Sequence, residues 1–295
     1  MANIEPALPR RQLGRYMREL RNQANLTLQD AAKLVQWSPS MLQRLEAGKL
    51  AEPREVDIRA LCKVYDSDDG TTEAMVNLGH QANEKSWWHE YTGVMRRGFD
   101  VYVGLEAVAE SLAIHQPELV PGLFQTNDYA RAVISARLSP ISAAEIDQKV
   151  QFRLRRQKAI LRTTRPTRVA AVIGEAGLRR VMGGSRIMAA QMRRLDELMT
   201  KDHISISILP FSAGCPAGEP LSSFVMLDFG QDAKGRPASP PFIYQEGYTG
   251  ELYQETDTAV RQYQEAFEAL RNSALNTHQG RNLIRQLTRE YERAA

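Results

Sequence analysis

Residues 38–49 read SPSMLQRLEAGK, and this stretch decides the fold of the first part of the chain. Ser38 is suited to cap a helix and Pro39 suits the first helical position. Gly48 suits the left-handed turn that ends a helix. The stretch therefore predicts a short helix whose two ends are both encoded locally. Its apolar side is formed by Leu42 and Leu45.

A second short helix is predicted just before it, in the sequence LQDAAKLV at residues 28–35, with Thr27 at its capping position. Only Gln36 and Trp37 separate the two helices. The small pair Ala31 and Ala32 allows the helices to cross closely, so the pattern predicts a helix-turn-helix. Further helices are expected at residues 10–24, ending at Asn25, and at residues 56–64.

The charge of this region is unevenly distributed along the chain. Residues 10–49 hold eight Arg or Lys (10, 11, 15, 18, 21, 33, 44, 49) and three acids (19, 30, 46), which gives +5. The whole chain carries +3, so the remainder carries about −2. A basic module on a nearly neutral body is typical of a domain that binds nucleic-acid phosphates.

The composition is that of an ordinary soluble protein of about two domains on the usual length prior. No apolar run approaches the roughly 18 residues of a membrane span, and residues 1–11 lack the core of a signal peptide. We therefore expect a cytoplasmic protein. Cys62 and Cys215 have no paired spacing, so neither a disulfide framework nor a zinc site is predicted.

From about residue 13 to residue 65 the sequence resembles the XRE family of helix-turn-helix repressors, most specifically in RLEAGK after LTLQDAAKLV. The resemblance implies an all-α, lambda-repressor-like domain that binds DNA. It also implies an ion pair between Arg21 and Glu46. Base-reading positions are implied for Ser38, Ser40, Gln43 and Arg44. Phosphate-contacting positions are implied for Thr27, Lys49 and Arg54. Gln36 stands where the family's turn often has glycine.

Beyond residue 66 we expect a connecting helix and then an α+β domain with a small sheet. The predicted strands are 169–173, 204–209, 224–229 and 242–245, and the predicted helices are 105–115, 128–137, 142–161, 186–200, 258–274 and 279–293. The fold class is therefore mainly α with a small α+β second domain. The predicted divisions are a flexible tail (1–9), the helix-turn-helix domain (10–66), the connecting helix (67–86), a regulatory or partner-binding domain (87–275) and a C-terminal basic helix (276–295).

Several motifs of the second domain keep one order: WW..Y, YVGLEA, VPGLFQT..YAR, R..RQ, GEAGLRR, ILPF and IYQE. Together they resemble the domain of unknown function that follows an XRE module in WhiJ-like regulators of spore-forming filamentous bacteria. The resemblance implies transcriptional control of development or specialised metabolism. It also implies a small protein partner of the BldB-like kind, in an arrangement described as toxin-antitoxin-like.

We expect no enzymatic activity, because no motif pairs a nucleophile with a base and no glycine-rich loop is suited to cradle phosphates. Neither a cofactor nor a metal ion is predicted. Small-molecule sensing and an autoregulating antitoxin remain as alternatives. Aromatic residues that suit a ligand pocket, or else a core, are Trp87, Trp88, Tyr102, Phe124, Tyr129 and Tyr244.

Two further features allow more than one interpretation. Trp87, Trp88 and Tyr91 suit either a domain interface or a ligand site. Residues 149–168 carry eight basic residues and no acid, including Arg153, Arg155 and Arg156, and arginines recur every fourth residue from Arg281. These stretches suit a solvated face, an acidic partner or flanking DNA. Because one helix-turn-helix reads few base pairs, we expect a homodimer on a two-fold operator.

Overall fold

The computed structural model describes residues 7–50, 52–83, 87–91, 93–96, 99–136, 141–230 and 239–295. By its internal contacts the chain divides into two compact units. The first unit is Met1–Glu90 with Gly98–Val108, and the second is Tyr91–Arg97 with Ala109–Ala295. Of the predicted flexible tail, residues 1–6 lie outside the described residues. Of the predicted connecting helix, residues 84–86 do as well.

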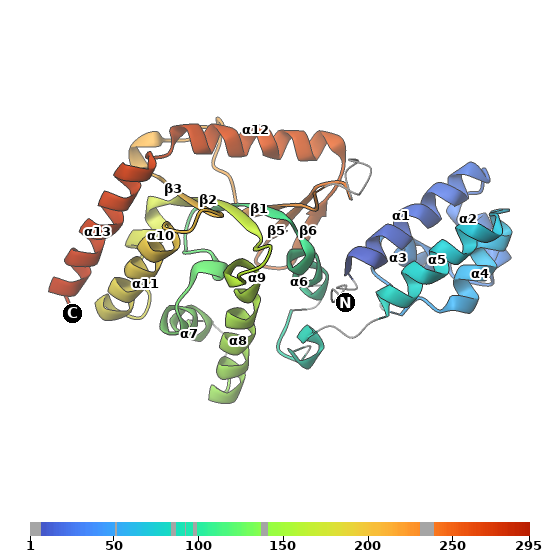
Figure 1. The fold of residues 1–295 in the computed structure, drawn as a ribbon, viewed down its shortest axis with the longest axis horizontal. Helices are drawn as coiled ribbons and strands as arrows, with labels where there is room; N and C mark the ends of the chain where they lie inside the picture. Colours follow the sequence, from blue (N-terminus) through green and yellow to red (C-terminus); the bar gives the residue numbers. More distant parts are fainter. Residues whose placement is uncertain are drawn as a thin grey trace. The chain divides into compact units, whose positions relative to one another are not determined.

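In the described residues of the first unit, every regular element is a helix (Figure 1). Its helices are α1 (Ala7–Gln23), α2 (Leu28–Leu34), α3 (Pro39–Glu46), α4 (Glu55–Val64), α5 (Asp69–Ala82) and α6 (Phe99–Val108). Leu13, Met17, Leu42 and Leu61 are fully buried in its core. The helix predicted to connect the domains is α5, which packs against α1 and α4.

The second unit contains one six-stranded mixed sheet in the order β3-β2-β1-β4-β5-β6. Its strands are β1 (Ser111–Gln116), β2 (Arg168–Gly174), β3 (Ile204–Leu209), β4 (Phe224–Asp228), β5 (Phe242–Glu246) and β6 (Glu251–Gln254). The strands β1, β2 and β3 pair in parallel, whereas β4, β5 and β6 continue from β1 in antiparallel pairs. Long crossovers containing helices join the three parallel strands, as parallel pairing requires.

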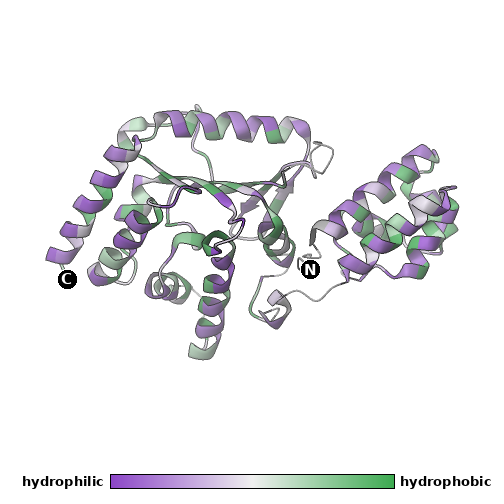
Figure 2. Cartoon of the chain, in the orientation of Figure 1, coloured by the Kyte–Doolittle hydropathy of each residue, from purple (hydrophilic) through white to green (hydrophobic). Residues whose placement is uncertain are grey.

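Helices cover the two faces of this sheet unequally. The 17-residue helix α12 (Asp257–Ser273) lies on one face, and most of the other helices lie on the opposite side (Figure 1). Besides α12, the α-helices of the second unit are α7 (Asn127–Ser135), α8 (Ala143–Arg156), α9 (Lys158–Leu161), α10 (Glu175–Arg179), α11 (Ser185–Leu198) and α13 (Thr277–Arg293). Figure 2 shows hydrophobic and hydrophilic positions alternating along α12, as an amphipathic helix on a sheet requires. An all-helical first domain followed by helices packed on a sheet is confirmed.

One predicted element is wrong. The sequence predicts a helix over residues 105–115, but α6 ends at Val108 and β1 begins at Ser111. The residues LEAVAESLA favour a helix by intrinsic propensity. In the fold, however, β1 pairs with β2 on one side and β4 on the other, and that pairing overrides local preference. The short elements β6 and α10 were not predicted.

The repeated arginines of the last helix are partly used inside the second unit. Arg281 Nε lies 2.8 Å from Asp196 Oδ1 of α11, and Arg285 Nε lies 3.2 Å from Asp196 Oδ2. These arginines lower the pKa of Asp196 against the opposing effect of burial, which is the largest single influence. The basic stripe of α13 thus helps to hold this helix on α11.

Candidate DNA-binding surface and a groove in the second unit

The helix α3 has the ends that its sequence predicts. The backbone N–H of Met41 donates to Ser38 Oγ at 3.2 Å, and Pro39 occupies the first turn. Gly48 has a φ of 65°, and the N–H of Lys49 donates to the carbonyl of Arg44 at 2.8 Å. These contacts satisfy backbone groups that a helix end would otherwise leave unpaired.

The turn between α2 and α3 is tight and places the two helices as a helix-turn-helix. The N–H of Trp37 donates to the carbonyl of Ala32 at 2.8 Å. Ala31 and Ala32 are fully buried at the crossing, as their small size suggested. Gln36 has a φ of 57°, a left-handed conformation that favours glycine.

This strain at Gln36 gives a stability prediction. Gln36→Gly is expected to stabilise the first unit by roughly 0.5–1 kcal/mol, since glycine adopts a positive φ without a Cβ clash. Gln36→Ala is the control, because it removes the side chain and keeps the strain. All three tryptophans, at 37, 87 and 88, lie in the first unit, so urea unfolding followed by tryptophan fluorescence reports on this unit. A glycine variant no more stable than the alanine variant would contradict the prediction.

The predicted base-reading residues lie on the exposed side of α3. Ser40, Gln43 and Arg44 are exposed, and so is Lys49 just beyond the helix. Ser38 is exposed too, but its Oγ caps the helix and lies 3.1 Å from Ser40 Oγ. The exposed face therefore offers a guanidinium, an amide and hydroxyls. Guanidinium and amide groups form two-pronged hydrogen bonds with guanine and adenine edges in a major groove.

Among the predicted phosphate-contacting residues, Thr27 already has a role inside the fold. Its Oγ1 accepts the N–H of Asp30 at 3.2 Å and donates to Asp30 Oδ2 at 2.6 Å. Thr27 thus caps α2 at the start of the motif. Contact of Thr27 with a phosphate stays a prediction.

Arg54 is exposed, directly precedes α4, and is held by Asp57 in the first turn of that helix. Its Nε lies 2.7 Å from Asp57 Oδ2, and its Nη2 lies 2.9 Å from Oδ1. This two-pronged pair raises the pKa of Arg54 through its hydrogen bonds with Asp57. A phosphate would have to compete with Asp57 for the same guanidinium.

Asp57→Asn therefore tests the role assigned to Arg54. We expect several-fold tighter DNA binding and a log–log salt dependence steeper by up to about 0.9, because Arg54 becomes free to bind a phosphate. The measurement is fluorescence anisotropy across a salt series. In an Arg54→Gln background, Asp57→Asn should raise the DNA affinity only slightly, because it then only removes one negative charge at a distance from the DNA. The same gain in both backgrounds would show that Arg54 does not contact a phosphate.

The expected ion pair between Arg21 and Glu46 is present. Arg21 Nε lies 2.6 Å from Glu46 Oε1 and Nη2 lies 2.9 Å from Oε2, while Nη1 donates to the carbonyl of Leu26. The Glu46 side chain is only 2% exposed and that of Arg21 is 11% exposed. Arg18 adds a weaker contact from the rim. The carboxylate thus ties α1 to the last turn of α3.

Two glycines allow α1 to approach α3 closely. A Cβ at Gly14 would lie 2.4 Å from the carbonyl oxygen of Leu45, and a Cβ at Gly48 would lie 2.9 Å from the Cα of Arg11. Gly48 was identified from the sequence, but Gly14 was not, because a close approach between distant segments leaves no local pattern. Gly14 fixes where the exposed face of α3 stands relative to α1.

In the second unit, three buried glutamines hold residues 120–126, the VPGLFQT motif. Gln125 Nε2 donates to Val120 O at 2.7 Å, and Gln157 Nε2 donates to Gln125 O at 2.8 Å. Gln191 joins the same segment through Phe124 O and the N–H of Thr126. The VPGLFQT motif and Gln157 of the R..RQ motif thus share one hydrogen-bond network inside the fold.

The predicted basic partner-binding face is partly engaged by this network. Arg153 Nη1 donates to Gln125 Oε1 at 2.7 Å, which gives Arg153 a structural role. The guanidinium of Arg155 lies 5.9 Å from the ring centre of Tyr91, which also packs on Phe152 at 5.3 Å. Arg153, Arg155 and Arg156 are all half-buried. Binding of a partner by Arg155 and Arg156 stays a prediction.

The aromatic residues considered for a ligand pocket lie in cores instead. Trp88, Tyr102, Phe124, Tyr129 and Tyr244 are each at most 5% exposed. Trp87 is half-buried and meets Trp88 edge-to-face at 5.8 Å. None of these aromatic residues lines the cavity described next.

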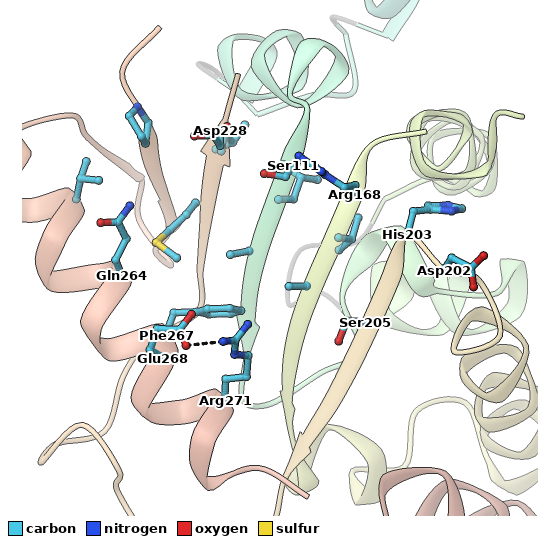
Figure 3. Close-up of a pocket in the computed structure, with 18 residues that line it drawn as sticks. Ser111, Arg168, Asp202, His203, Ser205, Asp228, Gln264, Phe267, Glu268 and Arg271 are labelled. Atoms are coloured by element: carbon cyan, nitrogen blue, oxygen red, sulfur yellow. Dashed lines mark hydrogen bonds and ion pairs between the residues drawn. The ribbon is translucent and has the colours of Figure 1, made fainter. Parts of the chain in front are cut away.

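A groove of about 420 Å³ lies in the second unit between α12 and the sheet (Figure 3). Its floor comes from β1, β2, β3 and β4, and one wall is the side of α12 that carries Gln264, Phe267, Glu268 and Arg271. The sequence did not predict this groove. Locating it requires the register of four strands, which no local pattern provides.

The geometry of the first unit defines a class of protein. A tight helix-turn-helix that leaves a polar, guanidinium-bearing face exposed on its second helix is the arrangement of DNA-binding regulators. Residues 12–75 match the family model described as helix-turn-helix domain, which supports this class. Residues 99–286, more than half of the chain, match the family "Domain of unknown function (DUF5753)". The chain therefore belongs to the DUF5753 family.

No curated protein and no solved structure matches the chain. Among the described residues, no helix is long and apolar enough to cross a membrane. In the same part of the chain, no group of three or more His, Cys, Asp or Glu side chains is placed to hold a metal ion.

Proposed function

We propose that this protein is a sequence-specific transcriptional regulator that binds an operator as a homodimer. The observation that carries the proposal is the exposure of Ser40, Gln43 and Arg44 on one capped helix within residues 10–49, a stretch whose net charge is +5. One such helix reads only a few base pairs, so two copies on two half-sites supply the specificity that a regulator needs. The half-sites would then lie about one helical turn apart, or a multiple of it.

The second unit, in this proposal, receives the signal that controls DNA binding. Its motif order favours a WhiJ-like regulator whose signal is a small protein partner of the BldB-like kind, acting in development or specialised metabolism. The chain carries out no catalysis and needs no cofactor. An antitoxin-like role, with DNA contacted only for autoregulation, is the further alternative.

A small-molecule signal is a second candidate, and one observation favours it. The groove beside α12 has a volume of about 420 Å³, within the roughly 300–1,000 Å³ typical of small-molecule sites. A protein partner would instead cover a broad surface, about 800 Å² on each side in a standard interface. A confined groove is therefore better suited to a small molecule.

The DNA-binding proposal is tested by selecting bound fragments from a random DNA pool and footprinting the enriched sequence. We expect two related half-sites and a dimer on DNA by analytical ultracentrifugation. Enrichment of no sequence over random DNA would overturn the proposal. A pull-down from the native cell, with mass spectrometry of proteins and small molecules, separates the two signals: recovery of only a metabolite would exclude the protein partner.

A further inference from the structure

The middle of the floor of the groove beside α12 carries small side chains. Ala113 of β1 lies opposite Ala170 of β2, and Ala170 lies opposite Ser205 of β3. On the other face of the same strands, Leu112 and Ile204 are buried under helices. Close packing normally fills the space above a sheet. Here three small residues in one row leave a recess that α12 borders without covering.

Polar residues border this apolar floor on both sides (Figure 3). Along one side, Asp228 of β4 lies opposite Ser111 of β1, and Ser111 lies opposite Arg168 of β2. His203 and Asp202 follow at the start of β3. This side crosses four strands, a span of about 14 Å at the usual strand spacing. The side formed by α12 carries Gln264, Glu268 and Arg271.

The charges around the groove do not cancel. Arg168 Nη2 lies 2.7 Å from Glu110 Oε1, and Arg271 Nη2 lies 2.7 Å from Glu268 Oε2, so each guanidinium has its own carboxylate. Two lining carboxylates remain without a cation among the described residues, namely Asp202 and Asp228. The Oδ1 atom of Asp228 accepts the N–H of Gly230 at 2.9 Å.

His203 lies on the same side of the groove and is held there by a hydrogen bond. Its Nε2 lies 2.8 Å from the carbonyl oxygen of Ile160. A carbonyl only accepts, so Nε2 is the donor in this contact. Asp202 and Asp228 are therefore the anionic acceptors beside the floor that have no cation among the described residues.

We propose that this groove binds a compact apolar organic cation, such as a ring-bearing amine. The ring system would lie on Ala113, Ala170 and Ser205, and the charged nitrogen would be held by Asp202 or Asp228. The proposal rests on the signal-receiving role proposed for the second unit and supplies the chemistry of that signal. A hydrophobic anion would meet, at either end of this side of the groove, a carboxylate that has no cation among the described residues.

The test compares two dyes of similar size by equilibrium dialysis against the full chain. Thioflavin T is an apolar cation, and 1-anilinonaphthalene-8-sulfonate is an apolar anion. We expect thioflavin T to bind at least about tenfold more tightly. Asp202→Asn combined with Asp228→Asn should weaken the binding of thioflavin T about tenfold, with each exposed carboxylate contributing a factor of roughly three. The anionic dye should bind no worse. Glu265→Gln, which removes one negative charge on α12 outside the groove, is the control for each of the two aspartate changes made singly.

A second set of variants tests the location of the site. Ala170→Leu fills the floor and should abolish thioflavin T binding. Ser205→Leu, at an exposed position on β3, gives the same test if Ala170→Leu does not fold. Equal affinity for both dyes, no binding of thioflavin T, or binding unchanged in a folded floor variant would each overturn the proposal. Dialysis needs no DNA, so its outcome is separate from the test of DNA recognition.

Discussion

Replacing Glu46 by alanine is expected to destabilise the first unit by about 3–5 kcal/mol, the cost of leaving one member of a buried ion pair alone. The Arg21 side chain, at 11% exposure, would keep its charge with only the carbonyl of Leu26 as a partner. The contact of Glu46 with Arg18 adds little to this figure, because Arg18 is 46% exposed. We therefore expect Glu46→Ala to be the most destabilising single change at the motif.

Urea unfolding followed by tryptophan fluorescence measures this loss in the first unit. The control is Glu19→Ala, which removes an exposed acid of α1 that lies 3.9 Å from Arg15. That change should cost less than about 1 kcal/mol. Arg21→Met combined with Glu46→Met should recover much of the loss, since an apolar pair leaves no unpaired charge. If Glu46→Ala cost no more than Glu19→Ala, the pair would not be what ties α1 to α3.

Arg44→Ala should remove discrimination at one base pair of the operator, worth about 1–3 kcal/mol. Arg44 stands on the exposed face of α3, in the last turn of the helix. Lys49 lies just after the helix, where contact with the backbone is expected. Lys49→Ala should weaken binding to all sequences alike and reduce the salt slope by about 0.9.

The measurement is anisotropy with the selected operator, its single-base variants and random DNA. Arg44→Ala should bind the operator and one set of single-base variants with nearly equal affinity, while it keeps most of its affinity for random DNA. Arg261→Gln in the second unit serves as a control for loss of one positive charge. Equal losses for Arg44→Ala and Lys49→Ala on specific and random DNA would show that Arg44 is not a base reader.

The elements predicted best from the sequence are those whose determinants are local. The cap Ser38, Pro39 in the first turn and Gly48 after the last turn act within a few residues of one another, so α3 could be placed closely. The strand β1 could not, since its conformation depends on pairing with β2 and β4, which are far away in the sequence.

The candidate sites divide in the same way. The exposed face of α3 follows from helical periodicity once the helix is known. The role of Gly14 depends on a contact with the carbonyl of Leu45, and the groove depends on strands brought into register across more than a hundred residues. Arg153 was assigned to a binding face on charge alone. The hydrogen bond to Gln125 that gives it a structural role involves a residue 28 positions away.

The packing of α6 limits which helix-turn-helix domains recombination can join to this second domain. The DUF5753 match begins at residue 99, at the start of α6, yet by its contacts α6 belongs to the helix-turn-helix unit, where it packs against α1. A recombination that joined a foreign helix-turn-helix domain just before residue 99 would bring in an α1 that had never been fitted to this α6. Exchange of domains at the boundary between the two family matches would therefore disturb the packing of α1 against α6. New combinations would survive only where α1 and α6 descended together or were refitted afterwards.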